Sequence, residues 1–119
     1  MFKILVVDDE PDLRYVLRRL FERAGHEVID AGHGAAAWEV VLRTPPDLVV
    51  TDMMMPVMDG AELIRKLRGD PATAEIPILA VTGDVQMAGD ADAVLSKPWH
   101  SHQLLAAVNA LMVKKAEQS

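Results

Sequence analysis

Residues 3–31 read KILVVDDEPDLRYVLRRLFERAGHEVIDA, and the order of patterns in this stretch decides the fold class. Residues 3–7 form a short, β-branched apolar run, which is typical of a strand buried on both faces. Pro11 then opens a stretch with apolar residues at helical spacing, and Gly25 is suited to end that helix. A second strand is predicted over 26–31. Strand, helix and strand in this order predict a β-α-β unit with parallel strands.

The same alternation continues along the rest of the chain. The spacing of apolar residues and the positions of Gly and Pro predict helices over 35–42 and 61–68, a last helix from Ser101, and strands over 48–51, 76–81 and around Val94 and Leu95. Alternating strands and helices predict an α/β fold in which an open, doubly wound parallel sheet carries helices on both faces.

Composition excludes several classes of function. A chain of 119 residues is expected to form one domain, and the absence of cysteine excludes disulfides and thiolate chemistry. The net charge of −6 argues against nucleic acid as a ligand of this domain. No apolar stretch approaches the ~18 residues that a membrane span needs. We therefore expect a cytoplasmic domain that binds neither nucleic acid nor membrane.

Five polar residues come at or just after the ends of the predicted strands: Asp8, Asp9, Asp52, Thr82 and Lys97. In an open parallel sheet, ligands bind outside the carboxyl ends of the strands. We therefore expect three carboxylates, one hydroxyl and one ammonium group to gather at one edge. Carboxylates that converge repel one another unless a hard cation such as Mg²⁺ lies between them.

This set of groups suits Mg²⁺-assisted phosphoryl transfer to a carboxylate. Asp52 would be the nucleophile that forms an aspartyl phosphate, and Thr82 and Lys97 would contact phosphoryl oxygens. Each residue also has an ordinary interpretation. Asp8 and Asp9 can be acidic residues favoured by a helix N-terminus, Thr82 a strand-end hydroxyl, and Lys97 a surface lysine. Their joint occurrence at four strand ends favours the functional interpretation.

Four motifs carry a resemblance to a known family: VVDDE (6–10), DMMMPVMDG (52–60), VTG (81–83) and LSKP (95–98). They resemble the receiver domain of two-component response regulators, and the resemblance covers residues 1–119. It implies a flavodoxin-like sheet of five parallel strands in the order 2-1-3-4-5. It also implies a cis peptide bond between Lys97 and Pro98.

The resemblance implies a role for each matching residue. Asp52 is expected to be the phosphoacceptor, and Thr82 and Lys97 are expected to contact the phosphoryl group. The expected Mg²⁺ ligands are Asp9 directly, Asp8 through water, Asp52, and Met54 through its backbone carbonyl.

The resemblance also implies partners. The phosphodonor would be a histidine on a sensor histidine kinase or a phosphotransfer protein, and phosphorylation would change binding to a downstream protein. We expect a monomer or weak dimer that is not an enzyme beyond its own phosphorylation and dephosphorylation. The first helix would belong to the phosphodonor docking surface, although its polar residues can equally form a solvated face: Arg14, Tyr15, Arg18, Arg19 and Arg23.

The chain departs from the family between Thr82 and Lys97. Only residues 83–96 separate them. The fifth strand takes about four of these residues, which leaves ~10 for the connection before it, whereas an average helix alone has ~11–12 residues. We therefore predict that the family's fourth helix is short or missing, with 85–88 as its one candidate turn. Val94 stands where the family usually carries an aromatic that reports phosphorylation.

Two other functions stay open at this point. A phosphatase of the haloacid dehalogenase type also uses an aspartyl phosphate, but its nucleophile follows the first strand as Asp-x-Asp and a cap covers its substrate. Here the first strand is followed by DDE (8–10), and no cap insertion is present. A degenerate receiver, acting as a binding module without phosphorylation, is favoured by the short connection and disfavoured by retention of all five polar residues.

Overall fold

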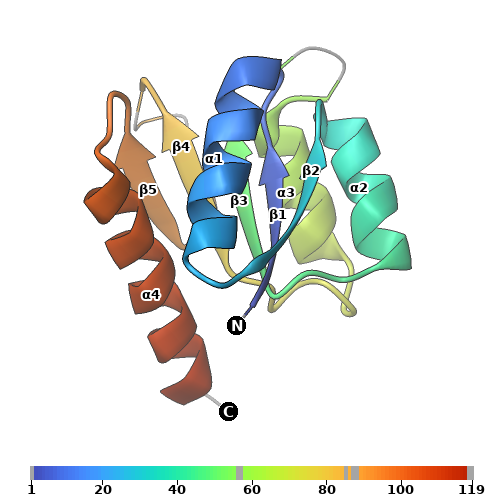
Figure 1. Ribbon diagram of the computed structural model, residues 1–119. Coiled ribbons are helices and arrows are strands. Elements are labelled where there is room, and N and C mark those ends of the chain that lie inside the picture. Colours follow the sequence, from blue (N-terminus) through green and yellow to red (C-terminus); the bar gives the residue numbers. More distant parts are fainter. Residues whose placement is uncertain (1, 56–57, 85, 87–88, 118–119) are drawn as a thin grey trace.

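The computed structural model describes residues 2–55, 58–84, 86 and 89–117, and it contains one parallel sheet (Figure 1). The strands are β1 (Lys3–Val7), β2 (Glu27–Ala31), β3 (Leu48–Asp52), β4 (Ile78–Thr82) and β5 (Ala93–Ser96). The helices are α1 (Pro11–Arg23), α2 (Gly34–Arg43), α3 (Gly60–Gly69) and α4 (Ser101–Glu117). The strand order is β2-β1-β3-β4-β5. The predicted α/β class and the flavodoxin-like order are both confirmed.

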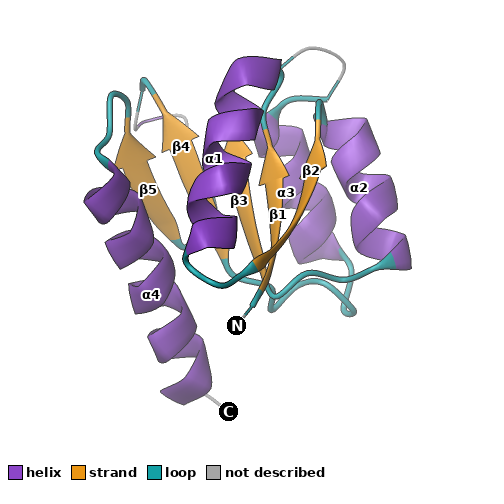
Figure 2. Cartoon of the chain, viewed as in Figure 1, coloured by secondary structure: helices purple, strands orange, loops and turns teal. Residues whose placement is uncertain are grey.

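Helices cover both faces of the sheet, with α1 and α4 on one face and α2 and α3 on the other (Figure 2). Because side chains alternate along a strand, neighbouring residues of β1 enter different cores. Val6 shares its core with Phe21 of α1, whereas Leu5 shares the opposite core with Leu63 of α3. All four residues are fully buried. The apolar runs are continuous, without polar alternation, because both faces of these strands are covered.

Local sequence signals define where the helices begin and end. Pro11 is the first residue of α1, as predicted, and its missing N–H costs no helical hydrogen bond there. Gly25, just beyond the end of α1, has φ +93°, a left-handed conformation that glycine adopts without strain. Asp59 caps α3, because its Oδ1 accepts a hydrogen bond from the Glu62 N–H at 2.9 Å. Pro11 and Asp59 therefore mark where the helices after β1 and β3 begin, and Gly25 marks where α1 ends.

The connection between β4 and β5 contains no α-helix among its described residues, which are 83, 84, 86 and 89–92. This confirms the prediction that the helix usual at this place is short or missing, and α4 is consequently the helix that follows β5. The predicted candidate turn over 85–88 lies largely outside the described residues. Val94, on β5, is 39% exposed.

Arg68, near the end of α3, holds the last part of this connection. Its Nη1 donates to the carbonyl oxygens of Ala74 and Ile76, at 2.9 and 3.1 Å. Its Nη2 donates to the Asp90 carbonyl at 3.0 Å and to the Asp92 carboxylate at 2.7 Å. The side chain of Arg68 is only 25% exposed. One guanidinium therefore joins the end of α3, the segment before β4 and the segment before β5.

Arg68→Met is expected to lower the free energy of unfolding by about 2 kcal/mol, since a hydrogen bond to a charged group typically contributes about 1.5–3 kcal/mol. Urea denaturation followed by circular dichroism measures the loss. Arg65→Met is the matched control, because Arg65 is an exposed arginine of the same helix and its replacement should change stability by less than about 0.5 kcal/mol. Equal losses in the two variants would show that the Arg68 contacts contribute nothing specific.

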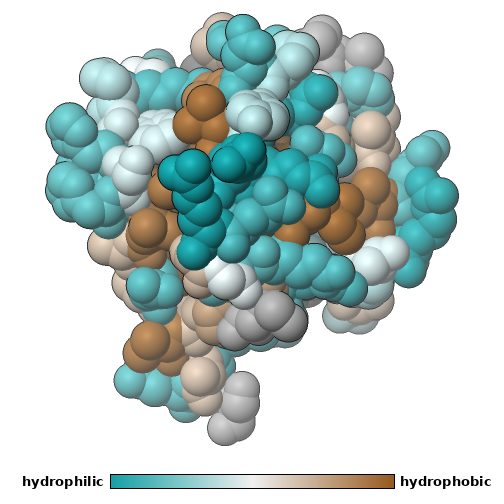
Figure 3. All heavy atoms as spheres, viewed as in Figure 1, coloured by the Kyte–Doolittle hydropathy of each residue, from teal (hydrophilic) through white to brown (hydrophobic). Residues whose placement is uncertain are grey.

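The surface is mainly hydrophilic on the face formed by α1 and α4, with small, separate hydrophobic patches (Figure 3). Val16 on α1 and Val113 on α4 are 50% and 57% exposed. Scattered apolar side chains of this kind are normal for a protein surface. None of the helices in the described part of the chain combines the length and apolar character that crossing a membrane requires.

Candidate functional site

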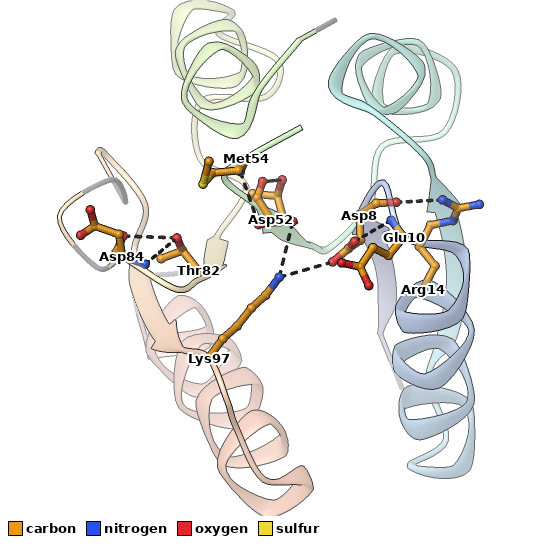
Figure 4. Close-up of polar contacts among 9 residues, drawn as sticks. Asp8, Glu10, Arg14, Asp52, Met54, Thr82, Asp84 and Lys97 are labelled. Carbon is orange, nitrogen blue, oxygen red and sulfur yellow. Dashed lines mark hydrogen bonds and ion pairs between the residues drawn. The ribbon is translucent and has the colours of Figure 1, made fainter. Parts of the chain in front are cut away.

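The ends of four neighbouring strands bring the predicted site residues to one edge of the sheet (Figure 4). Asp8 directly follows β1, Asp52 ends β3, Thr82 ends β4, and Lys97 directly follows β5. The strand register aligns Asp52 with Val81, so Thr82 extends one residue further along the edge. The parallel topology, rather than proximity in sequence, creates this cluster.

Three carboxylates form the centre of the site. Asp8, Asp9 and Asp52 each offer an oxygen atom, and these oxygens all lie within 4.8 Å of one another. The side chains of Asp8 and Asp52 are only 4% and 11% exposed, whereas Asp9 is exposed to solvent. A donor set of oxygen atoms with this charge could hold a metal ion, and it suits a hard divalent cation.

Lys97 supplies the positive charge next to these carboxylates. Its Nζ lies 3.5 Å from Asp52 Oδ2 and 4.0 Å from Asp8 Oδ2, and its side chain is 30% exposed. The backbone places it there, because the Lys97 N–H donates to the Thr82 carbonyl at 2.9 Å, which ties the end of β5 to the end of β4. The Lys97–Pro98 peptide bond is cis, as the resemblance implied.

Burial raises the pKa of the Asp8 carboxyl above its ordinary value. The hydrogen bond from the Glu10 N–H to Asp8 Oδ1, at 2.9 Å, opposes this rise, and the charge of Asp52 adds to it. The attraction of Lys97 lowers this pKa and is outweighed. The ionised form of the Asp8 carboxyl is therefore less favourable here than in water, despite the nearby charge of Lys97.

The turn after β3 fits closely around Asp52. The Met54 N–H donates to Asp52 Oδ1 at 3.4 Å, and the Gly60 N–H donates to the Met53 carbonyl at 3.1 Å. A Cβ atom at Gly60 would lie 2.5 Å from the Asp52 carbonyl oxygen, so only glycine permits this approach. The Met54 side chain is 66% exposed, which leaves its backbone as the part of the residue that belongs to the site.

Thr82 lies at the predicted edge, but its hydroxyl faces the β4–β5 connection rather than the carboxylates. Thr82 Oγ1 donates to the Asp84 carbonyl at 3.2 Å and accepts from the Asp84 N–H at 3.1 Å (Figure 4). Thr82 is 1% exposed. Its hydroxyl thus links the sheet edge to the segment that departs most from the expected family pattern.

Arg14 belongs to this site and was not predicted from the sequence. Its spacing in the sequence places Arg14 on the polar face of α1. In the structure its side chain points back toward β1, where its Nη1 donates to the Asp8 carbonyl at 2.8 Å. Its side chain is 24% exposed. The one available signal was its position in the first turns of a helix that starts three residues after Asp8.

Trp99 lines a groove of about 580 Å³. The other residues that line it are Glu10, Leu13, Lys97 and Pro98. Trp99 is half-buried and packs against the core under α1 and α4. The groove opens between the start of α1 and the loop after β5, next to Lys97.

Comparison with known proteins identifies the family. Residues 4–109 match the response regulator receiver domain. The chain is 35% identical over 120 residues to the response regulator receiver protein CpdR of Brucella abortus, with 95% of this chain and 98% of CpdR covered. The response regulator protein TrrA of Thermotoga maritima, solved in complex with Mg²⁺-BeF, is 28% identical, with a TM-score of 0.85 over 93% of this chain and 99% of TrrA.

A longer relative shows how much of some regulators the chain covers. It is 34% identical over 119 residues to the DNA-binding dual master transcriptional regulator RpaA of Synechocystis, covering 94% of this chain and 49% of RpaA. The chain therefore spans about half the length of some curated relatives. It belongs to the receiver domain family of two-component response regulators.

Proposed function

We propose that this chain is a phosphoacceptor in a two-component phosphorelay, and that Asp52 receives the phosphoryl group. One observation carries the proposal. The largely buried Asp52 carboxylate lies 3.5 Å from Lys97 Nζ and within a cluster of three carboxylates, at the strand ends of a receiver-family chain. A nucleophilic carboxylate, an adjacent cation and a potential metal site are the groups that phosphoryl transfer requires.

The transfer step makes one P–O bond and breaks one P–N bond. An Asp52 carboxylate oxygen attacks the phosphorus of a phosphohistidine, and the electron pair of the P–N bond stays on the imidazole nitrogen, which takes up a proton from solvent. Lys97 Nζ, already beside Asp52 Oδ2, pairs with one phosphoryl oxygen. Later attack by water on the phosphorus returns the free carboxylate and inorganic phosphate.

The residues that would hold Mg²⁺ are Asp8, Asp9, Asp52 and the backbone carbonyl of Met54. When bound, Mg²⁺ supplies the positive charge that offsets the phosphoryl oxygens and the three carboxylates. The raised pKa of Asp8, caused mainly by burial, supports this assignment, because a cation close by would stabilise the ionised carboxylate. The Mg²⁺-BeF complex of the relative TrrA supports the same choice of metal.

Thr82 would connect the phosphoryl group to the rest of the protein. To donate to a phosphoryl oxygen, its hydroxyl must leave the Asp84 carbonyl to which it now donates. Phosphorylation would thereby loosen the start of the β4–β5 connection, while Arg68 still holds Asp90 and Asp92 at its end. Such a change is a shift between two populated arrangements rather than a new fold.

The proposed partners follow from the family and the groove. A sensor histidine kinase or a histidine phosphotransfer protein would present its phosphohistidine at the groove beside Lys97, Pro98 and Trp99. A downstream protein would read the altered β4–β5 connection. One structural feature favours a second candidate, a degenerate receiver that binds partners without phosphorylation, because the described residues of that connection form no α-helix.

Incubation with acetyl phosphate and Mg²⁺, followed by intact mass measurement, tests the proposal. The expected result is an added mass of one phosphoryl group that disappears on standing and does not form in EDTA. No adduct from acetyl phosphate or from any histidine kinase tried would favour the binding module. Steady turnover of phosphomonoesters would instead indicate a phosphatase of the haloacid dehalogenase type.

A further inference from the structure

Asp8 is held by hydrogen bonds at three of its atoms. Its N–H donates to the Ala31 carbonyl at 3.2 Å, its carbonyl accepts from Arg14 Nη1 at 2.8 Å, and its Oδ1 accepts from the Glu10 N–H at 2.9 Å. Its second carboxylate oxygen, Oδ2, is the one that lies 4.0 Å from Lys97 Nζ. Three bonds therefore orient the residue so that Oδ2 is directed toward the site (Figure 4).

Arg14 is the only side chain among these three partners, and it is well fixed itself. Its Nε lies 3.9 Å from Asp30 Oδ2 near the end of β2, and its side chain is about three-quarters buried. A Cβ atom at Gly32 would lie 3.2 Å from Arg14 Nη1, so the glycine leaves space for the guanidinium. Residues from α1, β2 and the loop after β2 together place this donor against Asp8.

We propose that Arg14 is a positioning residue for the metal site, acting through the Asp8 backbone. This inference rests on the proposed function, in which Asp8 and Asp9 help to hold Mg²⁺. Without Arg14, the turn from β1 into α1 loses its side-chain tie to the end of β2. The Asp8 carboxylate would then sample other orientations, and Mg²⁺ binding would have to restore the present one at a cost in affinity.

The sign of the effect separates positioning from simple electrostatics. Arg14 is positively charged and lies next to the site, so removing its charge should by itself favour binding of a cation. A positioning role predicts the opposite, weaker binding. Arg18 provides the matched control, because its Nη1 lies 3.7 Å from the same Asp30 carboxylate but makes no described contact with Asp8.

Isothermal titration of the full chain with Mg²⁺ alone tests the proposal, using Arg14→Met, Arg14→Lys, Gly32→Ala and Arg18→Met. The expected result for Arg14→Met is an increase of about tenfold in the Mg²⁺ dissociation constant, the typical effect of removing a partner of a metal ligand. Arg14→Lys and Gly32→Ala should give smaller increases, and Arg18→Met none. Labelling by acetyl phosphate should return to the wild-type rate for Arg14→Met once Mg²⁺ is saturating.

Unchanged or tighter Mg²⁺ binding by folded Arg14→Met would overturn the proposal, and so would an equal loss in Arg18→Met. If Arg14→Met does not fold, the affinities of Arg14→Lys and Gly32→Ala for Mg²⁺ test the proposal, because both variants keep a positive charge at residue 14. Wild-type affinity in both variants would overturn the proposal. A wild-type chain that binds no Mg²⁺ would refute the proposed metal site itself. A wild-type chain that binds Mg²⁺ normally, with unaffected Arg14 variants, would refute only the role of Arg14.

Discussion

Asp52→Ala is expected to abolish the phosphoryl adduct formed from acetyl phosphate and Mg²⁺. Asp9 is a poor replacement for Asp52, because Asp9 is exposed to solvent whereas the Asp52 side chain is only 11% exposed. Asp52 also has the shorter contact with Lys97, 3.5 Å against 4.0 Å for Asp8. Intact mass spectrometry of both proteins under identical labelling conditions measures the outcome.

Asp12→Ala is the matched control for this loss. Asp12 is an exposed carboxylate in the first turn of α1, outside the cluster, and its removal should leave the adduct in place. Circular dichroism should show that Asp52→Ala is folded, since it removes one of three mutually repelling charges. An adduct of wild-type abundance in Asp52→Ala would move the phosphoacceptor to another residue and refute the assignment.

Asp8→Asn is expected to have opposite effects on stability and on metal binding. Because burial raises the pKa of Asp8 in the folded state, the folded protein holds this proton more tightly than the unfolded chain does. The associated stability is fully present below the ordinary aspartate pKa of about 3.9 and is lost as the pH rises through the raised value. At neutral pH without Mg²⁺, the asparagine variant should therefore unfold at a higher temperature than the wild type.

The same substitution should raise the Mg²⁺ dissociation constant by at least about tenfold, since even indirect partners of a metal ligand commonly contribute that much. Asparagine keeps an oxygen that can accept from the Glu10 N–H, so the local turn should survive. Thermal melts between pH 3 and pH 7, with EDTA or Mg²⁺, measure both effects. Asp12→Asn serves as the control for a general change in charge. A variant less stable than the wild type at neutral pH in EDTA would contradict the account of Asp8.

The regular elements were predictable because their signals are local. The apolar runs of β1, β3 and β4, Pro11 at the start of α1 and Gly25 beyond its end lie within a few residues of what they specify. A short or missing helix between β4 and β5 was predictable from spacing alone, because too few residues remain there to form an average helix. The strand order and the cis bond before Pro98 came from the resemblance to receivers, not from the residue pattern.

The contacts of the arginines and of Thr82 were not predictable in the same way. Arg14 and Arg68 were indistinguishable in sequence from solvent-exposed arginines, yet each donates to backbone carbonyls of other segments. Thr82 was expected to contact a phosphoryl group, and no feature of the sequence indicated that its hydroxyl also bonds to the Asp84 backbone. Side-chain direction depends on which acceptors the tertiary structure leaves without a partner, and hydropathy carries no information about that.

The sequence by itself determined the α/β class of this protein and the chemical groups of its site, because strand and helix periodicity and residue type are local properties. Only the tertiary structure decided how those groups meet. Asp8, Asp52 and Lys97 are far apart in the chain. The parallel strand register places Lys97 Nζ 3.5 Å from Asp52 Oδ2 and 4.0 Å from Asp8 Oδ2. It also placed Arg14 on the Asp8 carbonyl, a contact that requires α1, β1 and β2 to be packed together first.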